Sequence, residues 1–172
     1  MSAMMQAFYW DCPRAEGREF RWWDHLRERV PQLARAGFAT LWLPPAHKAA
    51  NIFGPSMGYD PYDYYDLGEY DQKGGAPTWF GTKAALLELI RMAHGHGLRV
   101  LADMVINHNS GADAEELNPL TGQRRWTLFQ PRSNRFPRNW ECFHPNPLES
   151  WDEDVFGEMP DLSHRNPYVF AE

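Results

Sequence analysis

The chain has 172 residues, of which 43% are hydrophobic, 15% aromatic and 23% charged, and its formal net charge is −6. Eight tryptophans, ten phenylalanines and seven tyrosines give too much apolar surface for an intrinsically disordered chain. The negative charge argues against a nucleic-acid partner, and no apolar run is long enough to span a membrane. The sequence predicts an ordinary folded chain with neither of those partners.

The amino-terminal sequence and the two cysteines both predict a cytoplasmic location, and secretion is the alternative if the sequence is truncated. Residues 1–6 do not show the charged segment and following apolar run of a signal peptide. Cys12 and Cys142 lie far apart and have no zinc-binding spacing. We expect two reduced, partly buried thiols, and a single disulfide is the alternative.

Strands and helices alternate in the first two thirds of the chain. In chain order we expect a strand at 5–10, a helix at 20–36, a strand at 38–43, a long loop at 46–79, a helix at 82–94 capped by Thr82, and a strand at 98–106. The last strand is nearly all apolar, which predicts burial on both of its faces. The alternation predicts an α/β fold, with a parallel sheet and helices packed outside it.

The chain changes character after residue 107. Residues 108–167 are rich in proline, asparagine, arginine and tryptophan and have no clear period, which predicts a separate small irregular domain or a functional excursion. Pro167 is typical of the first residue of another helix. Three strands alone would leave unpaired edges, so we expect the chain to be the front part of a longer protein.

Polar side chains cluster where the third predicted strand ends. In parallel α/β folds ligands bind at the carboxyl ends of the strands, so Asp103, Asn107 and His108 are candidate site residues. A charge such as Asp103 is costly to bury unless it is paired. The alternative is that Asp103 caps nearby amides while Asn107 and His108 only begin a loop.

Two further segments have the composition of binding sites. Residues 58–70 mix tyrosines with aspartates, which suits a carbohydrate site because aromatic rings cover sugar faces and carboxylates accept from hydroxyls. A packed loop without a ligand would have the same composition. Residues 149–154, followed by Asp161, offer hard oxygen ligands for calcium, although an ordinary solvated acidic loop is the alternative.

Four motifs, in order along the chain, resemble one enzyme family. The segments are 4–11 (MMQAFYWD), 56–74 (SMGYDPYDYYDLGEYDQKG), 103–108 (DMVINH) and 159–163 (MPDLS). Together they resemble the α-amylase family, glycoside hydrolase family 13, and are similar to its bacterial liquefying and archaeal thermostable members. The resemblance covers essentially the whole chain.

The resemblance implies a fold and an activity. That family has a (β/α)8 TIM barrel, so residues 1–107 would be the amino-terminal part of the catalytic barrel, with its first three βα units. Residues 108–165 would be the inserted domain B, linked to the barrel by calcium, and residues 166–172 would return into an incomplete barrel. The implied activity is endo-hydrolysis of α-1,4-glucosidic bonds in starch or glycogen with retention, by an enzyme that is monomeric when full-length.

The resemblance also assigns roles to particular residues. Tyr59 would stack on the sugar at the cleavage subsite, His108 would hydrogen-bond that sugar, and Asp103 would hold the geometry of the site. The implied structural calcium ligands are Asn107, Asp152, Asp154 and Asp161.

Two departures from the family pattern matter. The archaeal relatives hold a second metal, zinc, with two histidines and a cysteine; His144 matches one ligand, but Glu149 and Ser163 stand at the other two positions, so the zinc site is in doubt. The nucleophile, the acid/base and the transition-state-stabilising carboxylate come from later strands, so none is assigned here and this chain alone should be inactive. A glucan transferase or α-glucosidase of the same family, or a non-catalytic glucan-binding protein, remains an alternative.

Overall fold

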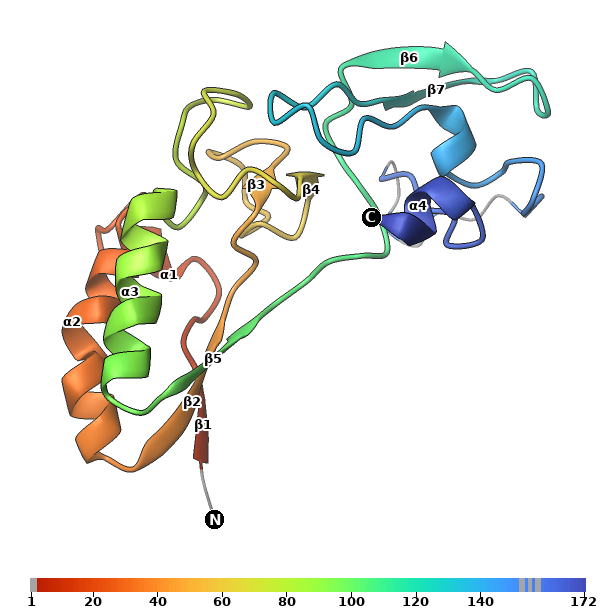
Figure 1. Ribbon diagram of the computed structural model, residues 1–172. Coiled ribbons are helices and arrows are strands. Elements are labelled where there is room, and N and C mark those ends of the chain that lie inside the picture. The colour runs from red at the N-terminus through yellow and green to blue at the C-terminus, as the bar shows by residue number, and fades with distance from the viewer. Residues whose placement is uncertain (1–2, 152–153, 155, 157–158) are drawn as a thin grey trace.

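The computed structural model describes residues 3–151, 154, 156 and 159–172. Its elements in chain order are β1 (Ala3–Gln6), α1 (Cys12–Ala15), α2 (Trp22–Arg35), β2 (Phe38–Leu43), β3 (Lys48–Ala49), β4 (Pro61–Asp63), α3 (Lys83–Gly95), β5 (Arg99–Ala102), β6 (Ala114–Leu117), β7 (Arg124–Leu128), the 3-10 helix η1 (Trp140–Cys142) and α4 (Pro167–Ala171). We call residues 3–107 the first region and the described residues of 108–172 the second region. Figure 1 shows them as two bodies joined by the extended chain that leaves β5.

The first region is built on a parallel sheet with strand order β1-β2-β5. Helices α2 and α3 lie side by side against one face of this sheet (Figure 1). The predicted α/β class and helix packing are confirmed, and the sheet is not closed into a barrel among the described residues.

Helix bounds follow the local signals in the sequence. The side chain of Thr82 accepts a hydrogen bond from the amide of Ala85 and so caps α3 as predicted. Gly37 follows the end of α2 with φ +91°, a conformation that glycine adopts without strain. Pro167 is the first residue of α4, as expected.

The strands at the sheet edges differ from the prediction. The first strand is Ala3–Gln6 rather than 5–10, and the third is only Arg99–Ala102 rather than 98–106. Burial of the third strand on both faces is wrong for this chain, because Leu101 is 48% exposed. The physical reason is that α2 and α3 cover one face of the sheet, and β5 is one of its edges.

Each region has its own apolar cluster. In the first, Trp23 is fully buried and its ring lies 5.2 Å from that of Phe80. In the second, Phe129 and Phe143 are fully buried, with ring centroids 5.4 Å apart. Tyr62 of β4 packs into this second cluster, so the loop of the first region reaches the second.

The second region contains more regular structure than its sequence predicts. Strands β6 and β7 form an antiparallel hairpin in a segment where no periodicity is visible. The long loop at 46–79 likewise contains the short antiparallel pair β3–β4.

Cys12 and Cys142 are free and buried, as expected, and burial raises the pKa of the Cys12 thiol to about 12.

Candidate sugar and cation sites

The carboxyl end of β5 places Asp103 against the tyrosine loop. The Tyr59 hydroxyl donates a hydrogen bond to Asp103 Oδ2 at 2.8 Å. Burial, together with that hydrogen bond and the negative charge of Asp103, raises the pKa of Tyr59 well above its ordinary value. Tyr59 therefore stays a neutral donor, and it fixes the orientation of the Asp103 carboxylate.

His108 contacts the same tyrosine through the main chain. Its side chain is 5% exposed, and its Nε2 lies 2.9 Å from the carbonyl oxygen of Tyr59. A carbonyl can only accept, so Nε2 carries the proton in this arrangement. The structure thus brings together all three residues expected to bind sugar, with Tyr59 at the centre, and it already engages the Nε2 proton of His108.

Trp10 lies beside Tyr59 as well, although we did not predict it from the sequence. We call Tyr59, Asp103, His108 and Trp10 the Tyr59 constellation. Its ring stacks on that of Tyr59, with centroids 6.3 Å apart and planes 11° from parallel, and it is 64% exposed. The two rings form a partly open aromatic surface beside Asp103. The available signal was that Trp10 is the last residue of the predicted strand at 5–10, because the carboxyl ends of parallel strands share one edge of the sheet.

His47 contacts the main chain of the tyrosine loop at 58–70, and we did not predict this contact from the sequence. Its Nε2 lies 3.1 Å from the carbonyl oxygen of Gly58, the residue before Tyr59. Burial lowers the pKa of His47 to about 4, so its ring is neutral near pH 7. Gly58 has φ +85°, and a Cβ there would lie 3.1 Å from the carbonyl oxygen of Pro45, so the close approach of the loop to this segment favours glycine.

The predicted calcium ligands lie where the two regions meet. The side-chain nitrogen of Asn107 donates to Asp161 Oδ1 at 2.9 Å, and the amide of Leu162 donates to the Asn107 carbonyl at 2.8 Å. The amide of Asp161 in turn donates to Asp154 Oδ1 at 3.1 Å. Asn107, Asp154 and Asp161 are therefore adjacent, whereas the fourth predicted ligand, Asp152, lies outside the described residues.

These residues fit a hard cation in part. The amide of Asn107 and the carboxylate of Asp161, which is 3% exposed, supply adjacent oxygen-bearing groups of the kind calcium prefers. Asp154 instead forms an ion pair with Arg125, which supplies positive charge from the protein itself. Within the described residues no group of three or more His, Cys, Asp or Glu side chains could hold a metal ion.

The three residues at the zinc position of the archaeal relatives also come together. Ser163 Oγ donates to Glu149 Oε2 at 2.6 Å, and His144 Nε2 lies 3.3 Å from the same oxygen. Burial alone would raise the pKa of Glu149, but the hydrogen bond from Ser163 and the nearby His144 and Arg165 hold it below its ordinary value. Direct contacts between protein groups therefore connect these three positions.

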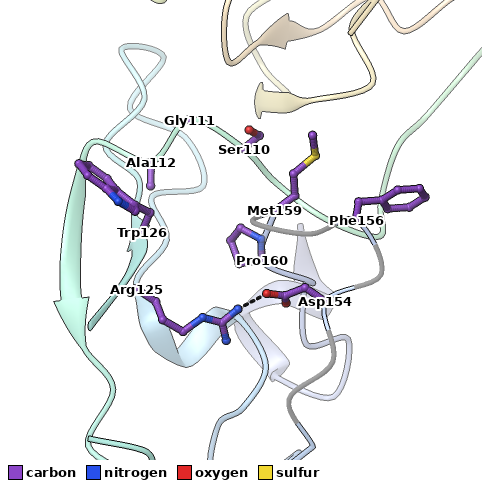
Figure 2. A pocket seen from close by; sticks show the side chains of 9 residues that line it. All are labelled: Ser110, Gly111, Ala112, Arg125, Trp126, Asp154, Phe156, Met159 and Pro160. Atoms are coloured by element: carbon purple, nitrogen blue, oxygen red, sulfur yellow. Dashed lines mark hydrogen bonds and ion pairs between the residues drawn. The ribbon is translucent and has the colours of Figure 1, made fainter. Parts of the chain in front are cut away.

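A hollow of about 710 Å³ lies in the second region, and Asp154, one of the predicted calcium ligands, is among the residues that line it (Figure 2). Figure 2 shows Trp126 and Phe156 on opposite sides of it, with the Arg125–Asp154 ion pair between them at its base. Trp126 and Phe156 are each 56% exposed, and the ring of Phe156 also lies 4.8 Å from that of His108. The hollow is thus connected to the Tyr59 constellation through Phe156.

Comparison with known proteins agrees with this architecture. A family model described as the catalytic domain of alpha amylase matches residues 15–172. The chain is 41% identical over 168 residues to an alpha-amylase of Bacillus licheniformis, covering 87% of this chain and 31% of that protein. It is 45% identical over 113 residues to a cytoplasmic alpha-amylase of Escherichia coli, covering 66% of this chain and 22% of that protein.

Solved structures agree on the fold. An alpha-amylase from Geobacillus thermoleovorans, complexed with acarbose, matches 87% of this chain with 28% of its own length, at TM-score 0.54 and 24% identity. A cyclomaltodextrin glucanotransferase with a three-domain ABC distribution matches 85% of this chain with 31% of its own, at TM-score 0.57 and 23% identity. The matched segments thus span 22–31% of the length of these relatives.

Proposed function

The chain belongs to the α-amylase catalytic-domain family, and from that premise we propose that it supplies one wall of the glucan site of a retaining α-1,4-glucan hydrolase. The observation that carries this proposal is the Tyr59 constellation. An aromatic surface formed by Tyr59 and Trp10 lies beside the carboxylate of Asp103, at the carboxyl end of β5, and aromatic faces beside carboxylates suit sugar rings and their hydroxyls.

Each residue has a distinct proposed role. Tyr59 covers the apolar face of one sugar ring, while its hydroxyl keeps the Asp103 carboxylate in place. His108 fixes the main chain of Tyr59 and hydrogen-bonds the same sugar after its ring exchanges one of its present partners. The exposed ring of Trp126, across the hollow, offers a further apolar surface to a long glucan.

We propose that the carboxylates that catalyse hydrolysis lie outside this chain. A retaining hydrolase needs two carboxyl groups about 5–5.5 Å apart, one protonated and one ionised. We assign neither role within the chain and propose that both come from later strands of the barrel. The domain division that we propose has the same basis: residues 1–107 are part of the barrel, residues 108–165 are the inserted domain, and residues 166–172 return into the barrel.

The test uses the protein expressed from its complete gene, with maltoheptaose as substrate. Tyr59→Ala should lower kcat/KM by one to two orders of magnitude, because it removes a stacking surface worth about 0.5–1.5 kcal/mol and a hydrogen bond to a carboxylate worth about 1.5–3 kcal/mol. Tyr70→Ala, a tyrosine of the same loop that is 38% exposed, is the matched control. Unchanged kinetics in Tyr59→Ala, with an intact fold, would remove Tyr59 from the sugar site.

Analysis of the products separates the related activities. A hydrolase yields only chains shorter than maltoheptaose, whereas a glucan transferase of the same family also yields longer ones. Retardation in a starch-containing gel without release of reducing sugar would instead identify a non-catalytic glucan-binding protein. We propose hydrolysis because alpha-amylases are among the similar proteins that match at 36–45% identity.

A structural calcium ion is the proposed cofactor. The oxygens of Asn107 and Asp161 would hold it, with Asp154 and Asp152 as the further expected ligands. When bound, calcium would join the two regions electrostatically and so stabilise the cleft between them. Zinc is not proposed, because Glu149, Ser163 and His144 already bind one another.

Calcium is tested through stability rather than activity. Removing the metal with a chelator should lower the melting temperature of the complete protein, and returning calcium should restore it by mass action on the folded state. Asp161→Asn should weaken that response, whereas Asp71→Asn, an exposed residue of the first region, should preserve it. A melting temperature independent of calcium in a demonstrably metal-free sample would contradict the site.

Location and assembly complete the proposal. Among the described residues no helix has both the length and the apolar content that a bilayer crossing requires. We propose a cytoplasmic monomer, a location supported by the similarity to the cytoplasmic alpha-amylase of Escherichia coli. Fractionation of the native host and size-exclusion chromatography with light scattering would test the two parts of this proposal separately.

A further inference from the structure

Lys48 of β3 carries a charge in the interior of the molecule. Its side chain is 0% exposed, and so is that of Asp66, with which it forms an ion pair at 3.3 Å. The ammonium also lies close to four main-chain carbonyl oxygens, those of Tyr70 (3.2 Å), Gly75 (2.8 Å), Ala76 (2.7 Å) and Pro77 (2.8 Å). Five oxygens surround a group with only three protons, an arrangement that resembles the oxygen shell of a bound cation.

The five oxygens around the Lys48 ammonium, which we call the cage, come from one loop. All of them belong to residues 66–77, which follow β4 and contain no strand or helix of the elements described. Carbonyl groups that converge in a buried place repel one another unless a positive charge lies between them. The Lys48 ammonium supplies that charge, so the path of the loop depends on it.

The cage is connected to the second region through Gln72. The side-chain nitrogen of Gln72 donates to Asp66 Oδ2 at 2.8 Å and to Asp63 Oδ2 at 2.9 Å. Its side-chain oxygen accepts from the amide of Arg132 at 3.0 Å, and Ser133 Oγ donates to Asp63 Oδ1 at 2.9 Å. A continuous chain of polar contacts therefore runs from buried Lys48 to the partly exposed residues 132–133, the segment after β7.

We propose that the Lys48 ammonium is an internal cation that shapes the 66–77 loop and thereby holds the second region against the first. Lys48 is thus a positioning residue that acts at one junction of the two regions, apart from the Asn107–Asp161 junction. The polar connection through Lys48 does not depend on which glucan is bound or on which reaction is catalysed.

A cation role predicts chemical rescue. In the protein expressed from its complete gene, Lys48→Ala should lower the melting temperature and leave a cage that a free cation of similar size can enter. Ammonium chloride should then raise the melting temperature of the variant more than that of the parent, by mass action. Tetramethylammonium chloride at the same ionic strength is too large for the cage and should have no such effect.

A matched lysine controls for charge and salt. Lys83 pairs with Glu69 at 2.7 Å but is 38% exposed, so Lys83→Ala should change the melting temperature little and show no ammonium-specific response. If ammonium and tetramethylammonium affected Lys48→Ala equally, the Lys48 side chain would be acting by packing alone, and the proposal would be overturned.

Hydrogen exchange tests the connection to the second region. Lys48→Met should speed exchange of the amides at 75–76 and at 132–133 by about a hundredfold or more, because breaking a buried charged pair costs several kcal/mol. Gln72→Met removes one hydrogen bond to Asp66 but keeps the Lys48 ammonium and its four carbonyl partners, so it should speed exchange mainly at 132–133.

The second variant keeps the proposal testable if Lys48→Met does not fold. Faster exchange at 132–133 in Gln72→Met, with 75–76 unchanged, supports a connection that runs outward from the cage. Unchanged exchange at 132–133 would show that residues 66–77 do not hold the second region, and that result would overturn the proposal.

Discussion

The two regions are stabilised in different ways. In the first, α2 and α3 bury an apolar face against a parallel sheet, and fully buried Trp23 and Leu41 belong to the resulting cluster. In the second, regular structure is sparse and buried polar side chains such as Arg138 and Asn146 make specific contacts. The α2–α3 layer of the first region therefore depends mainly on the volume of its side chains, whereas the second region depends on hydrogen-bonding groups as well as on its smaller apolar cluster.

The largest expected effect tests the apolar region. Trp23→Ala should lower the free energy of unfolding by about 3–5 kcal/mol, because the ring is fully buried and the cavity left against Phe80 cannot collapse completely. Denaturant unfolding measures the change. Leu87→Ala, on α3 but 46% exposed, should cost far less, and equal losses in the two variants would contradict the importance of core volume.

The next effect concerns a buried carboxyl group at the edge of the first region. Asp60 lies in the loop before β4, where burial raises its pKa to about 6 despite hydrogen bonds from Ser56 and from main-chain amides. The folded state therefore binds a proton more tightly than the unfolded state. The free energy of unfolding should rise as the pH falls through 6 toward 4, by up to about 3 kcal/mol.

The measurement is denaturant unfolding across pH 4 to 7. This range includes both the ordinary pKa of an aspartate, about 4 in the unfolded state, and the raised pKa of Asp60, about 6 in the folded state. Asp60→Asn should remove most of the slope in that interval, since the group no longer titrates. Asp71→Asn, which changes an exposed aspartate of the same loop system, should keep it. A slope that survives in Asp60→Asn would assign the proton to another group.

The smallest expected effect tests the polar contacts of the second region. Asp113 accepts from the Tyr62 hydroxyl at 2.7 Å, from the Gln130 amide at 2.7 Å and from Lys73 at 2.8 Å. Asp113→Ala leaves these donors without their acceptor and should cost roughly 1–3 kcal/mol. Glu116→Ala removes a partly buried carboxylate of β6 that accepts from the Thr127 hydroxyl at 3.0 Å, and it should cost less.

The pH dependence of Asp113 should have the opposite sign to that of Asp60. Burial alone would raise its pKa, but hydrogen bonds from Lys73, the Gln130 amide and Tyr62 outweigh burial and hold the pKa below its ordinary value. Its stabilising contribution should be present above pH 4 or so and should be lost as the pH falls further. A parent-minus-Asp113→Ala difference that does not shrink in acid would contradict this assignment.

Local signals in the sequence predict the first region well. The strand Phe38–Leu43 has its predicted bounds, and the Thr82 cap is confirmed, because both depend on a few neighbouring residues. The β3–β4 pair was not predicted, since it joins Lys48 to Asp63 across a long loop and leaves no periodic signal. The β6–β7 hairpin is local, since Leu117 pairs with Arg124, but it was missed because its strands show no clear alternation of apolar and polar residues.

The candidate sites were predictable only where residue type and strand position agree. Asp103 and His108 follow the third predicted strand, and the structure places both against Tyr59. Trp10 and His47 contribute to the same place through contacts across the fold, which residue types alone do not reveal. The adjacency of Asn107 and Asp161 agrees with the predicted ligand set, and calcium binding itself stays a prediction.

The bridge from Tyr62, Asp63 and Gln72 to residues 113, 132 and 133 has a consequence for protein engineering and for exchange of segments between homologues. A graft cut only at residues 107 and 165 would transfer the acceptors or donors on one side of the junction and leave buried groups of the recipient unmatched. The unit to exchange between homologues is therefore discontinuous, and residues 108–165 should be transferred together with residues 59–77.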